Sequence, residues 1–328
     1  MSSGKILITT RSFRKTPGQH QQILLDAGYE VVNSPYDRAC TAAELAELIV
    51  GMDGAILGVD EVTAEVFAAA DNLKVVSRYG VGIDSVDVDA ASAHGIVVTN
   101  TPGGNSNSVA ELTITLMLAL ARNIPLHDRN SRKDEWGLVK GRELAGSTLG
   151  ILGMGRIGQR VAEIAHVFGI TLLFHDPYPP GDAFMHRIPC ELSTMEHIIS
   201  ESDFVSLHLP LLPETQNLLN ADTLATMKST AYLVNTARGG LVDEAALYNA
   251  LSAGKLAGAA FDVFEEEPPR SNPLVALPNF ITTPHIGSAT LQTTLRMGLM
   301  ASQNALAVLT GAPCEYVINP GTYTWQKE

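Results

Sequence analysis

The chain has little cysteine and few aromatic residues. Three of its 328 residues are cysteine, and aromatic residues make up 6%. Cys40, Cys190 and Cys314 are far apart in sequence and form no CxxC pair, so neither a disulfide framework nor a zinc site is expected. This pattern predicts a reducing, cytoplasmic location and no bound metal.

Basic residues are also scarce, since 22 Lys and Arg stand beside 35 Asp and Glu and give a net charge of −13. Nucleic acid and anionic membranes bind basic surfaces, so neither is expected as a partner. No run of 18 apolar residues appears, and the segment from Met1 to Lys5 does not resemble a signal peptide. An anionic ligand would need local Arg or Lys side chains.

What remains is the composition of a globular protein, with 45% hydrophobic and 17% charged residues. This excludes a disordered chain. The length is sufficient for two domains, and no internal repeat or low-complexity segment is present.

One stretch combines a buried strand, a glycine-rich turn and a helix. The apolar run 149–152 precedes Gly153, Gly155 and Gly158, which match G-x-G-x-x-G, and a helical pattern occupies 161–168. The glycines permit a tight turn and let the backbone approach a pyrophosphate at the helix N-terminus. Because the strand and helix accompany the glycines, the stretch predicts a dinucleotide site.

An acid follows this stretch at the expected distance. A second apolar run, 171–174, ends in His175 and Asp176, and Asp176 is 18 residues after Gly158. A carboxylate there binds the adenosine ribose hydroxyls and repels a 2′-phosphate, so NAD is expected over NADP. His175 is interpreted as a partly buried residue at a strand end.

Strands and helices alternate before the glycine-rich stretch, which predicts a parallel, doubly wound sheet without a dinucleotide fingerprint. A capping box at Thr41 and Glu44 predicts a helix start. The expected strands are 5–9, 29–32, 55–57, 73–77 and 95–99, and further helices are expected at 19–27 and 84–94.

A turn-rich joint at 101–107 separates this sheet from an apolar helix at 109–120, expected to be buried against a domain or subunit partner. The charged segment 128–143 is interpreted as a loop or arm in which Trp136 is a packing or interface residue. Later strands are expected at 204–208, 231–235, 258–262 and 280–283, and a last helix at about 288–309. Residues 101–289 are therefore expected to form an NAD-binding domain inserted into a substrate domain of 1–100 plus 290–328.

Polar residues follow the strands after the fingerprint, where ligands bind in open α/β sheets. They are His208, followed by Pro210, then Arg238, Asp262 and His285. Reduction of a 2-keto acid with NADH needs a proton donor, which His can supply, and a cation for the substrate carboxylate, which Arg can supply.

A carboxylate beside the His would favour imidazolium and orient the ring. Glu265, Glu266 and Glu267 lie between Asp262 and His285, and the residues alone do not decide among them. The alternative interpretation of all three is a solvated acidic turn.

Basic residues follow the first expected strand, with Arg11, Arg14 and Lys15 close together, and Arg78 ends the fourth. One interpretation is a solvated basic loop. The other is that Arg11 or Arg78 binds a second anionic group of the substrate, such as a phosphate or carboxylate.

Several motifs resemble those of the D-isomer-specific 2-hydroxyacid dehydrogenases, most closely the phosphoglycerate dehydrogenase branch. The resemblance extends from about residue 5 to residue 320. Its motifs, besides the glycine-rich stretch, are Arg78-Tyr-Gly-Val-Gly-Ile-Asp84, Asn100-Thr-Pro-Gly-Gly-Asn-Ser106, Asn235-Thr-Ala-Arg-Gly239, Asp262-Val-Phe-Glu-Glu-Glu-Pro268 and Thr283-Pro-His-Ile-Gly287.

The resemblance implies an α/β fold of two doubly wound parallel-sheet domains, with the NAD-binding Rossmann domain inserted into a flavodoxin-like substrate domain. It implies an NAD-dependent oxidoreductase acting on a small anionic 2-hydroxy or 2-keto acid, first 3-phosphoglycerate and second glyoxylate or hydroxypyruvate. A non-enzymatic NAD sensor of the same fold is the rival. A homodimer formed by the cofactor domains is expected, and a C-terminal regulatory domain is not.

The resemblance also implies residue roles. Arg238 is the catalytic arginine, and Glu267, directly before Pro268, pairs with the acid/base His285. Val81, Gly82 and Asn105 are expected to bind the substrate together with the Arg11 and Arg78 named above. The cofactor residues are expected to be Gly153, Gly155, Arg156, Ile157, Gly158, Asp176, His208, Pro210, Thr215, Thr236, Ala237, Asp262, Gly287 and Ser288.

Overall fold

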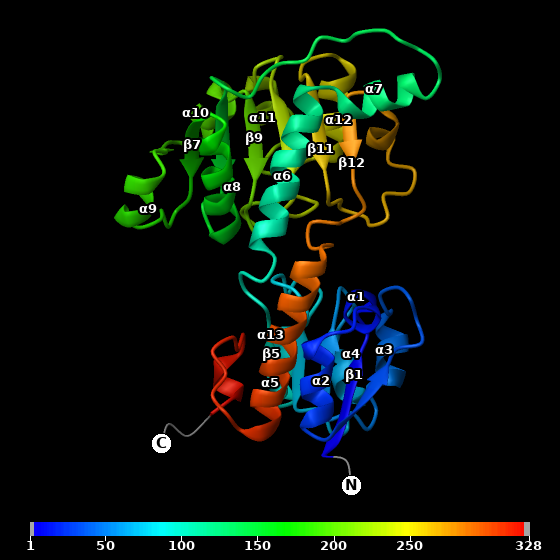
Figure 1. The fold of residues 1–328 in the computed structure, drawn as a ribbon. Helices are drawn as coiled ribbons and strands as arrows, with labels where there is room; N and C mark the ends of the chain where they lie inside the picture. The colour runs from blue at the N-terminus through cyan, green and yellow to red at the C-terminus, as the bar shows by residue number, and fades with distance from the viewer. Residues whose placement is uncertain (1–2, 325–328) are drawn as a thin grey trace. The chain divides into compact units, whose positions relative to one another are not determined.

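The computed structural model describes residues 3–324 and divides into two compact units (Figure 1). Unit 1 comprises Met1–Asn105 and Ser288–Glu328, and unit 2 comprises Ser106–Gly287. Residues 325–328, at the end of the expected substrate domain, lie outside the described residues. The chain therefore passes between the units at Asn105–Ser106 and again at Gly287–Ser288.

Unit 1 contains a five-stranded parallel sheet in the order β2-β1-β3-β4-β5. Its strands are β1 (Gly4–Ile8), β2 (Tyr29–Asn33), β3 (Gly54–Leu57), β4 (Val75–Arg78) and β5 (Val97–Thr99). Its helices are α1 (Arg11–Lys15), α2 (Gln19–Asp26), α3 (Ala42–Leu48), α4 (Ala64–Ala69), α5 (Val88–Ala93) and α13 (Leu291–Thr310), followed by the 3-10 helix η2 (Pro320–Thr322). Separate apolar cores cover the two faces of the sheet, as expected for a doubly wound domain.

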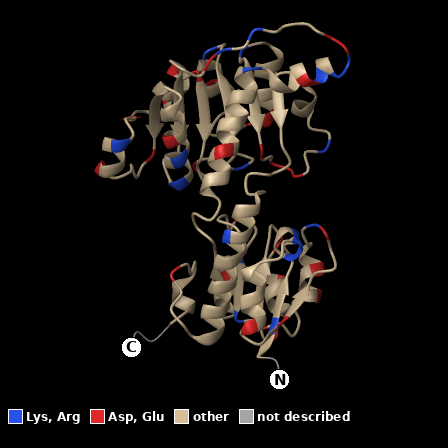
Figure 2. Cartoon of the chain, in the orientation of Figure 1, with Lys and Arg blue, Asp and Glu red and all other residues tan. Residues whose placement is uncertain are grey.

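Two segments of unit 1 differ from the expected elements. The helix expected at 84–94 begins only at Val88, because Asp87 accepts a hydrogen bond from the Ala90 amide and caps it. The basic segment after β1 is the helix α1 and not a loop; its Lys and Arg residues are blue in Figure 2. Phe13 anchors this helix, since it is fully buried against the His20 ring. The capping box of Thr41 and Glu44 is present as predicted.

Unit 2 contains a seven-stranded parallel sheet in the order β12-β11-β10-β9-β6-β7-β8. Its strands are β6 (Thr148–Leu152), β7 (Thr171–His175), β8 (Glu191–Leu192), β9 (Phe204–Leu207), β10 (Tyr232–Asn235), β11 (Gly258–Phe261) and β12 (Phe280–Thr282). Its helices are α6 (Ser106–Ala121), α7 (Ile124–Ser131), α8 (Arg156–Val167), α9 (Asp182–Arg187), α10 (Met195–Glu201), α11 (Ala221–Thr226), α12 (Glu244–Ser252) and the 3-10 helix η1 (Pro273–Ala276).

The apolar helix α6 is buried within its own unit. It packs against α8 and against strands β10 and β11, and Ile114, Met117 and Leu120 belong to the core on that face. In the described part of the chain, no single helix is long and apolar enough to span a membrane. Helices α6 and α7 meet that test only as a pair, and their axes bend by 62° at the junction.

The segment after α6 projects from unit 2 (Figure 1). Residues 128–131 belong to α7, which corrects the expected loop, whereas 132–143 have no regular structure. Trp136 and Leu138 in this segment are 84% and 91% exposed. We call residues 122–143 the arm.

Candidate active site

The three glycines of the fingerprint serve three different purposes. Gly153 has φ +98°, and a Cβ there would lie 2.6 Å from the His208 carbonyl oxygen. A Cβ on Gly158 would lie 2.1 Å from the Gly153 carbonyl oxygen, so only glycine allows α8 to approach the turn this closely. A Cβ on Gly155 would meet no atom within 4 Å, so the space beside this residue is open.

The N-terminus of α8 is suited to an anion. The helix begins at Arg156 and Ile157, and its cap residue Gly155 provides no side-chain hydrogen bond to the first amides. These amides and the positive end of the helix dipole are therefore available to a pyrophosphate.

Asp176 follows β7 and is fixed beside the glycine turn. Its Oδ2 accepts from the Met154 amide at 2.6 Å, and its Oδ1 accepts from the Tyr178 amide at 2.7 Å. Both oxygens retain lone pairs for ribose hydroxyls. The open turn, the uncapped helix and this carboxylate together fit an adenine dinucleotide.

The loop after β9 lies at the same edge of the sheet. Burial lowers the pKa of His208 to about 3, so its ring is neutral, and its Nε2 lies 2.9 Å from Ser206 Oγ. Thr215 Oγ1 donates to the Pro210 carbonyl at 2.7 Å and accepts from the Leu212 amide at 2.8 Å. These bonds fix the loop that carries three of the expected cofactor residues.

Hydroxyl groups of α6 hold the ends of β10 and β12. Thr113 Oγ1 lies 2.9 Å from Thr236 Oγ1, beside Ala237, and Ser108 Oγ donates to the Gly287 carbonyl at 2.6 Å. Sequence reasoning missed Thr113 and Ser108, because a polar residue in an apolar helix carries no pattern that marks it as functional.

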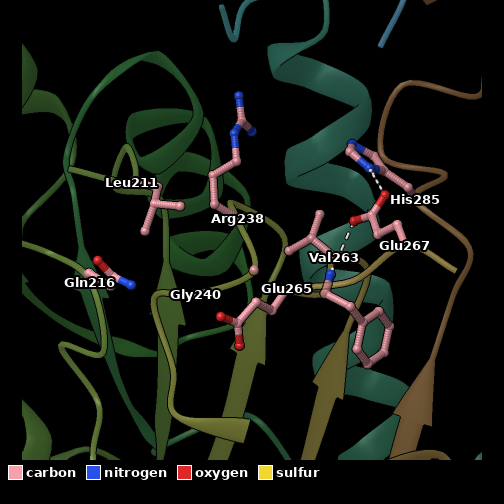
Figure 3. Close-up of a pocket in the computed structure, with 10 residues that line it drawn as sticks. Leu211, Gln216, Arg238, Gly240, Val263, Glu265, Glu267 and His285 are labelled. Atoms are coloured by element: carbon pink, nitrogen blue, oxygen red, sulfur yellow. Dashed lines mark hydrogen bonds and ion pairs between the residues drawn. The ribbon is translucent and has the colours of Figure 1, made fainter. Parts of the chain in front are cut away.

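Arg238, Glu267 and His285 line one cavity of about 180 Å³ (Figure 3). Arg238 follows β10, Glu267 follows β11 and His285 follows β12, so adjacent parallel strands bring them together. His285 Nδ1 lies 2.8 Å from Glu267 Oε2. The other ring nitrogen, Nε2, is not used in this pair.

The pairing shifts both protonation equilibria. The hydrogen bond that His285 Nδ1 donates to the Glu267 carboxylate raises the pKa of His285 against the opposing effect of burial. Burial alone would raise the pKa of Glu267, but the hydrogen bond and charge of His285 outweigh it, and the net shift is downward. The pairing therefore favours the charged forms of both groups, imidazolium and carboxylate, over their neutral forms.

Among the three glutamates, Glu267 is the one bonded to His285. Its second oxygen, Oε1, accepts from the Phe264 amide at 3.1 Å, which orients the carboxylate. Glu265 also lines the cavity, but its amide donates to Glu244. The choice that the residues alone left open is decided by the fold of this turn.

Asp262 fixes the loop that carries His285. It is 1% exposed, and it accepts from Thr283 Oγ1 at 2.5 Å and from the amides of Ile286 and Gly287 at 2.8 Å each. His285 itself has φ +52°, an uncommon conformation for a non-glycine residue, and its amide donates to the Asp262 carbonyl. The expected contact of Asp262 with nicotinamide stays a prediction.

The expected substrate residues all lie in unit 1. Arg78 ends β4 and donates to the Tyr79 carbonyl at 2.8 Å. The next turn contains Val81 and Gly82, and the Val81 carbonyl accepts from Asn100. Asn105 Nδ2 donates to Ser288 Oγ at 3.1 Å, which also places Ser288 in unit 1.

The basic residues of α1 are engaged with one acid. Arg11 lies 3.9 Å and Arg14 3.4 Å from Asp37, which also pairs with Lys15. Arg14 additionally donates to the carbonyls of Thr9, Ser34 and Tyr36. Residues 3–324 contain no cluster of His, Cys, Asp or Glu that could hold a metal.

Comparison with known proteins agrees with this architecture. Residues 114–287 match the family model of the D-isomer specific 2-hydroxyacid dehydrogenase, NAD binding domain. The chain belongs to this family. A solved structure with a similar fold is the NAD-dependent formate dehydrogenase from Staphylococcus aureus in complex with NAD, with TM-score 0.83, 32% identity, and coverage of 96% of this chain and 98% of that one.

Two curated relatives differ in how much of their length is matched. The chain is 44% identical to D-3-phosphoglycerate dehydrogenase of Methanocaldococcus jannaschii over 85% of this chain and 54% of that protein. It is 38% identical to glyoxylate reductase of Thermofilum pendens over 97% of this chain and 95% of that protein. The chain thus spans about half the length of the phosphoglycerate dehydrogenases it matches.

Proposed function

We propose that the chain is an NAD-dependent D-2-hydroxyacid dehydrogenase that transfers hydride between NAD(H) and a small anionic 2-hydroxy or 2-keto acid. The observation that carries this proposal is the Glu267–His285 pair at 2.8 Å, on one cavity with Arg238. A protein that only senses NAD needs the dinucleotide cradle and has no use for an acid/base pair, so the complete set favours an enzyme.

The residues divide the chemistry among them. NAD, when bound, supplies or accepts the hydride. In the reduction, His285 donates a proton to the carbonyl oxygen, and in the reverse direction it removes that proton from the hydroxyl. Glu267 stabilises the imidazolium through Nδ1, and Arg238 binds the substrate carboxylate and polarises the carbonyl.

For the substrate, we favour a monoanionic 2-keto acid such as glyoxylate or hydroxypyruvate. All three cations of α1 lie within 3.9 Å of Asp37, so a second anionic group of the substrate would compete with this carboxylate for them. The match over almost the whole length of a glyoxylate reductase supports the same choice. 3-Phosphoglycerate is the second candidate, supported by the 44% identity to a phosphoglycerate dehydrogenase.

The assay is the absorbance of NADH during incubation with a panel of 2-keto acids, and of NAD with the matching 2-hydroxy acids. We expect turnover with D-isomers and none with L-isomers. No turnover with any acid, together with tight NADH binding, would instead favour the sensor.

We further propose a homodimer formed through unit 2. The support is the arm, residues 122–143, which contains no buried residue yet carries Trp136 and Leu138 at the surface. Light scattering should give the mass of two chains, and Trp136→Ser with Leu138→Ser should reduce it toward one.

A cytoplasmic location is also proposed. Cys40, Cys190 and Cys314 are all free thiols, which suits a reducing compartment. Fractionation of cells that express the tagged chain would test it.

A further inference from the structure

Arg296, in the second turn of α13, has an unusual environment. Its side chain is half-buried, and it donates from Nε to the Gly104 carbonyl at 2.7 Å and from Nη2 to Thr293 Oγ1 at 3.2 Å. Both acceptors are neutral. Within residues 3–324, no carboxylate lies within 4.0 Å of this guanidinium.

Several other arginines in the chain are paired with acids. Each of five has a carboxylate oxygen within 3.0 Å, namely Arg38, Arg132, Arg142, Arg160 and Arg187. The chain has 13 more acidic than basic residues, as its net charge of −13 shows, so acids are abundant. A half-buried cation among neutral groups loses hydration without a compensating charge, which favours an anion from outside the chain.

The carbonyl that Arg296 binds belongs to the turn that contains Asn105. A Cβ on Gly104 would lie 2.6 Å from Met297 Cγ, so this turn is seated directly on α13. The Gly104 amide donates to the Thr101 carbonyl, and the Thr101 amide donates to the Gly80 carbonyl at 3.0 Å. The turn of Asn105 and the turn of Val81 are therefore hydrogen-bonded neighbours.

Unsatisfied polar groups gather at these two turns. Thr101 is fully buried, and its Oγ1 has no hydrogen-bond partner within the described chain. The amides of Val81 and Gly82 likewise make no hydrogen bond among residues 3–324. Successive free amides beside glycine form a concavity that binds anions.

We propose that Arg296 is a specificity residue of the substrate site: it holds the Asn105 turn in place and supplies the positive charge that attracts the substrate carboxylate to the Val81 and Gly82 amides. This rests on the proposed function, because it assigns an anionic acid to this site. It also explains how a chain of net charge −13 binds an anion without the cations of α1.

The variants separate charge from packing. Arg296→Gln keeps an N–H donor but removes the charge, Arg296→Lys keeps the charge, and Arg296→Met removes both. The matched control is Arg38→Gln, which removes an exposed arginine of the same unit that pairs with Glu44. Thermal unfolding of each variant shows whether unit 1 stays folded.

With glyoxylate and NADH, we expect Arg296→Gln to raise KM about tenfold, because a positive charge near the carboxylate is lost, and to change kcat by less than about threefold. Arg296→Lys should have a KM close to that of the wild type, because it keeps the charge, and Arg38→Gln should leave KM unchanged. Rising salt should increase the KM of the wild type more than that of Arg296→Gln. The proposal would be overturned if Arg296→Gln left KM unchanged, or if Arg296→Lys and Arg296→Gln raised KM equally.

Calorimetric binding of oxamate, a small molecule with one carboxylate, tests the site without turnover. Oxamate should bind the wild type, and it should bind Arg296→Gln more weakly by a factor similar to the increase in KM. If the wild type reduced no acid but still showed this difference, the proposed function would fail while the anion site stood. Equal oxamate affinity in both proteins would refute the anion site whatever the activity.

Discussion

The protonation state of His285 is set by the residue beside it. Glu267 raises the pKa of His285, so the imidazolium persists to higher pH than an isolated histidine would allow. Reduction requires the protonated ring and oxidation the neutral ring. Activity in the reducing direction should therefore fall as pH rises through this pKa, and activity in the oxidising direction should rise.

Glu267→Gln should move both pH profiles of kcat/KM to lower pH, because a neutral amide no longer stabilises imidazolium. The measurement is kcat/KM against pH in both directions for the wild type and the variant. Superimposable profiles would show that the pair does not control catalysis.

His285→Ala and Arg238→Ala should impair different steps. Loss of the proton donor should lower kcat by about 10²–10⁴-fold with NADH affinity kept. Arg238 contacts substrate before and during the reaction, so its loss should also raise KM. Steady-state kinetics and NADH titration distinguish the two, and near-normal turnover of His285→Ala would exclude it as the acid.

Asp176 should determine the cofactor preference. Its carboxylate is fixed by the Met154 and Tyr178 amides beside the glycine turn, where a 2′-phosphate would be repelled. We expect kcat/KM to be higher with NADH than with NADPH, and Asp176→Ala to reduce the ratio. If the ratio of kcat/KM with NADH to that with NADPH stayed the same in Asp176→Ala, another residue would determine the selectivity.

Residues positioned by the order of strands and helices could be located from the sequence, and those positioned by a folded turn could not. The sequence located the glycines after β6 and Asp176 after β7, because this spacing follows from strand and helix lengths; their contacts with a cofactor stay a prediction. The choice of Glu267 among three glutamates needed the geometry of the turn before β12. The cation of Arg296 lies in an ordinary helical pattern, so only its neutral surroundings distinguish it.

At the scale of elements, the βαβ alternation was a sound guide because parallel strands buried on both faces are continuous apolar runs. Short helices were missed where their apolar content was low. Helix α1 depends on one buried side chain, Phe13, and α7 buries none. Phe13 contacts the rings of His20 and Tyr79, so α1 is stabilised by residues outside its own five.

Two glycines of one turn should differ in how substitution by alanine affects stability. Gly158→Ala places a Cβ against the Gly153 carbonyl, so it should lower the melting temperature and abolish NADH binding. Gly155→Ala meets no atom within 4 Å and should leave the melting temperature unchanged while weakening NADH binding. Calorimetry with NADH titration measures both, and a fully active Gly155→Ala would refute the assigned position of the pyrophosphate.

At the scale of the whole molecule, the net charge of −13 bears on the choice of substrate. A chain this acidic disfavours a dianion unless dedicated cations bind the second group. We expect hydroxypyruvate to be reduced at least as efficiently as its 3-phosphate, and Arg11→Ala to leave the ratio of their kcat/KM values unchanged. A preference for the phosphorylated acid that Arg11→Ala or Arg78→Ala erased would instead select 3-phosphoglycerate.

The chain passes between the units twice, so unit 2 can be removed from the chain as one continuous segment. Ser108 and Gly287 are hydrogen-bonded at 2.6 Å, so the two ends of unit 2 are adjacent, and Asn105 and Ser288 are joined at 3.1 Å on the side of unit 1. Unit 2 is thus a self-contained cassette, and a linker of a few residues would close the gap its removal leaves. Exchange of such a cassette between homologues would move the cofactor residues together with Arg238, Glu267 and His285, and would leave Arg296 and the turn of Val81 in place.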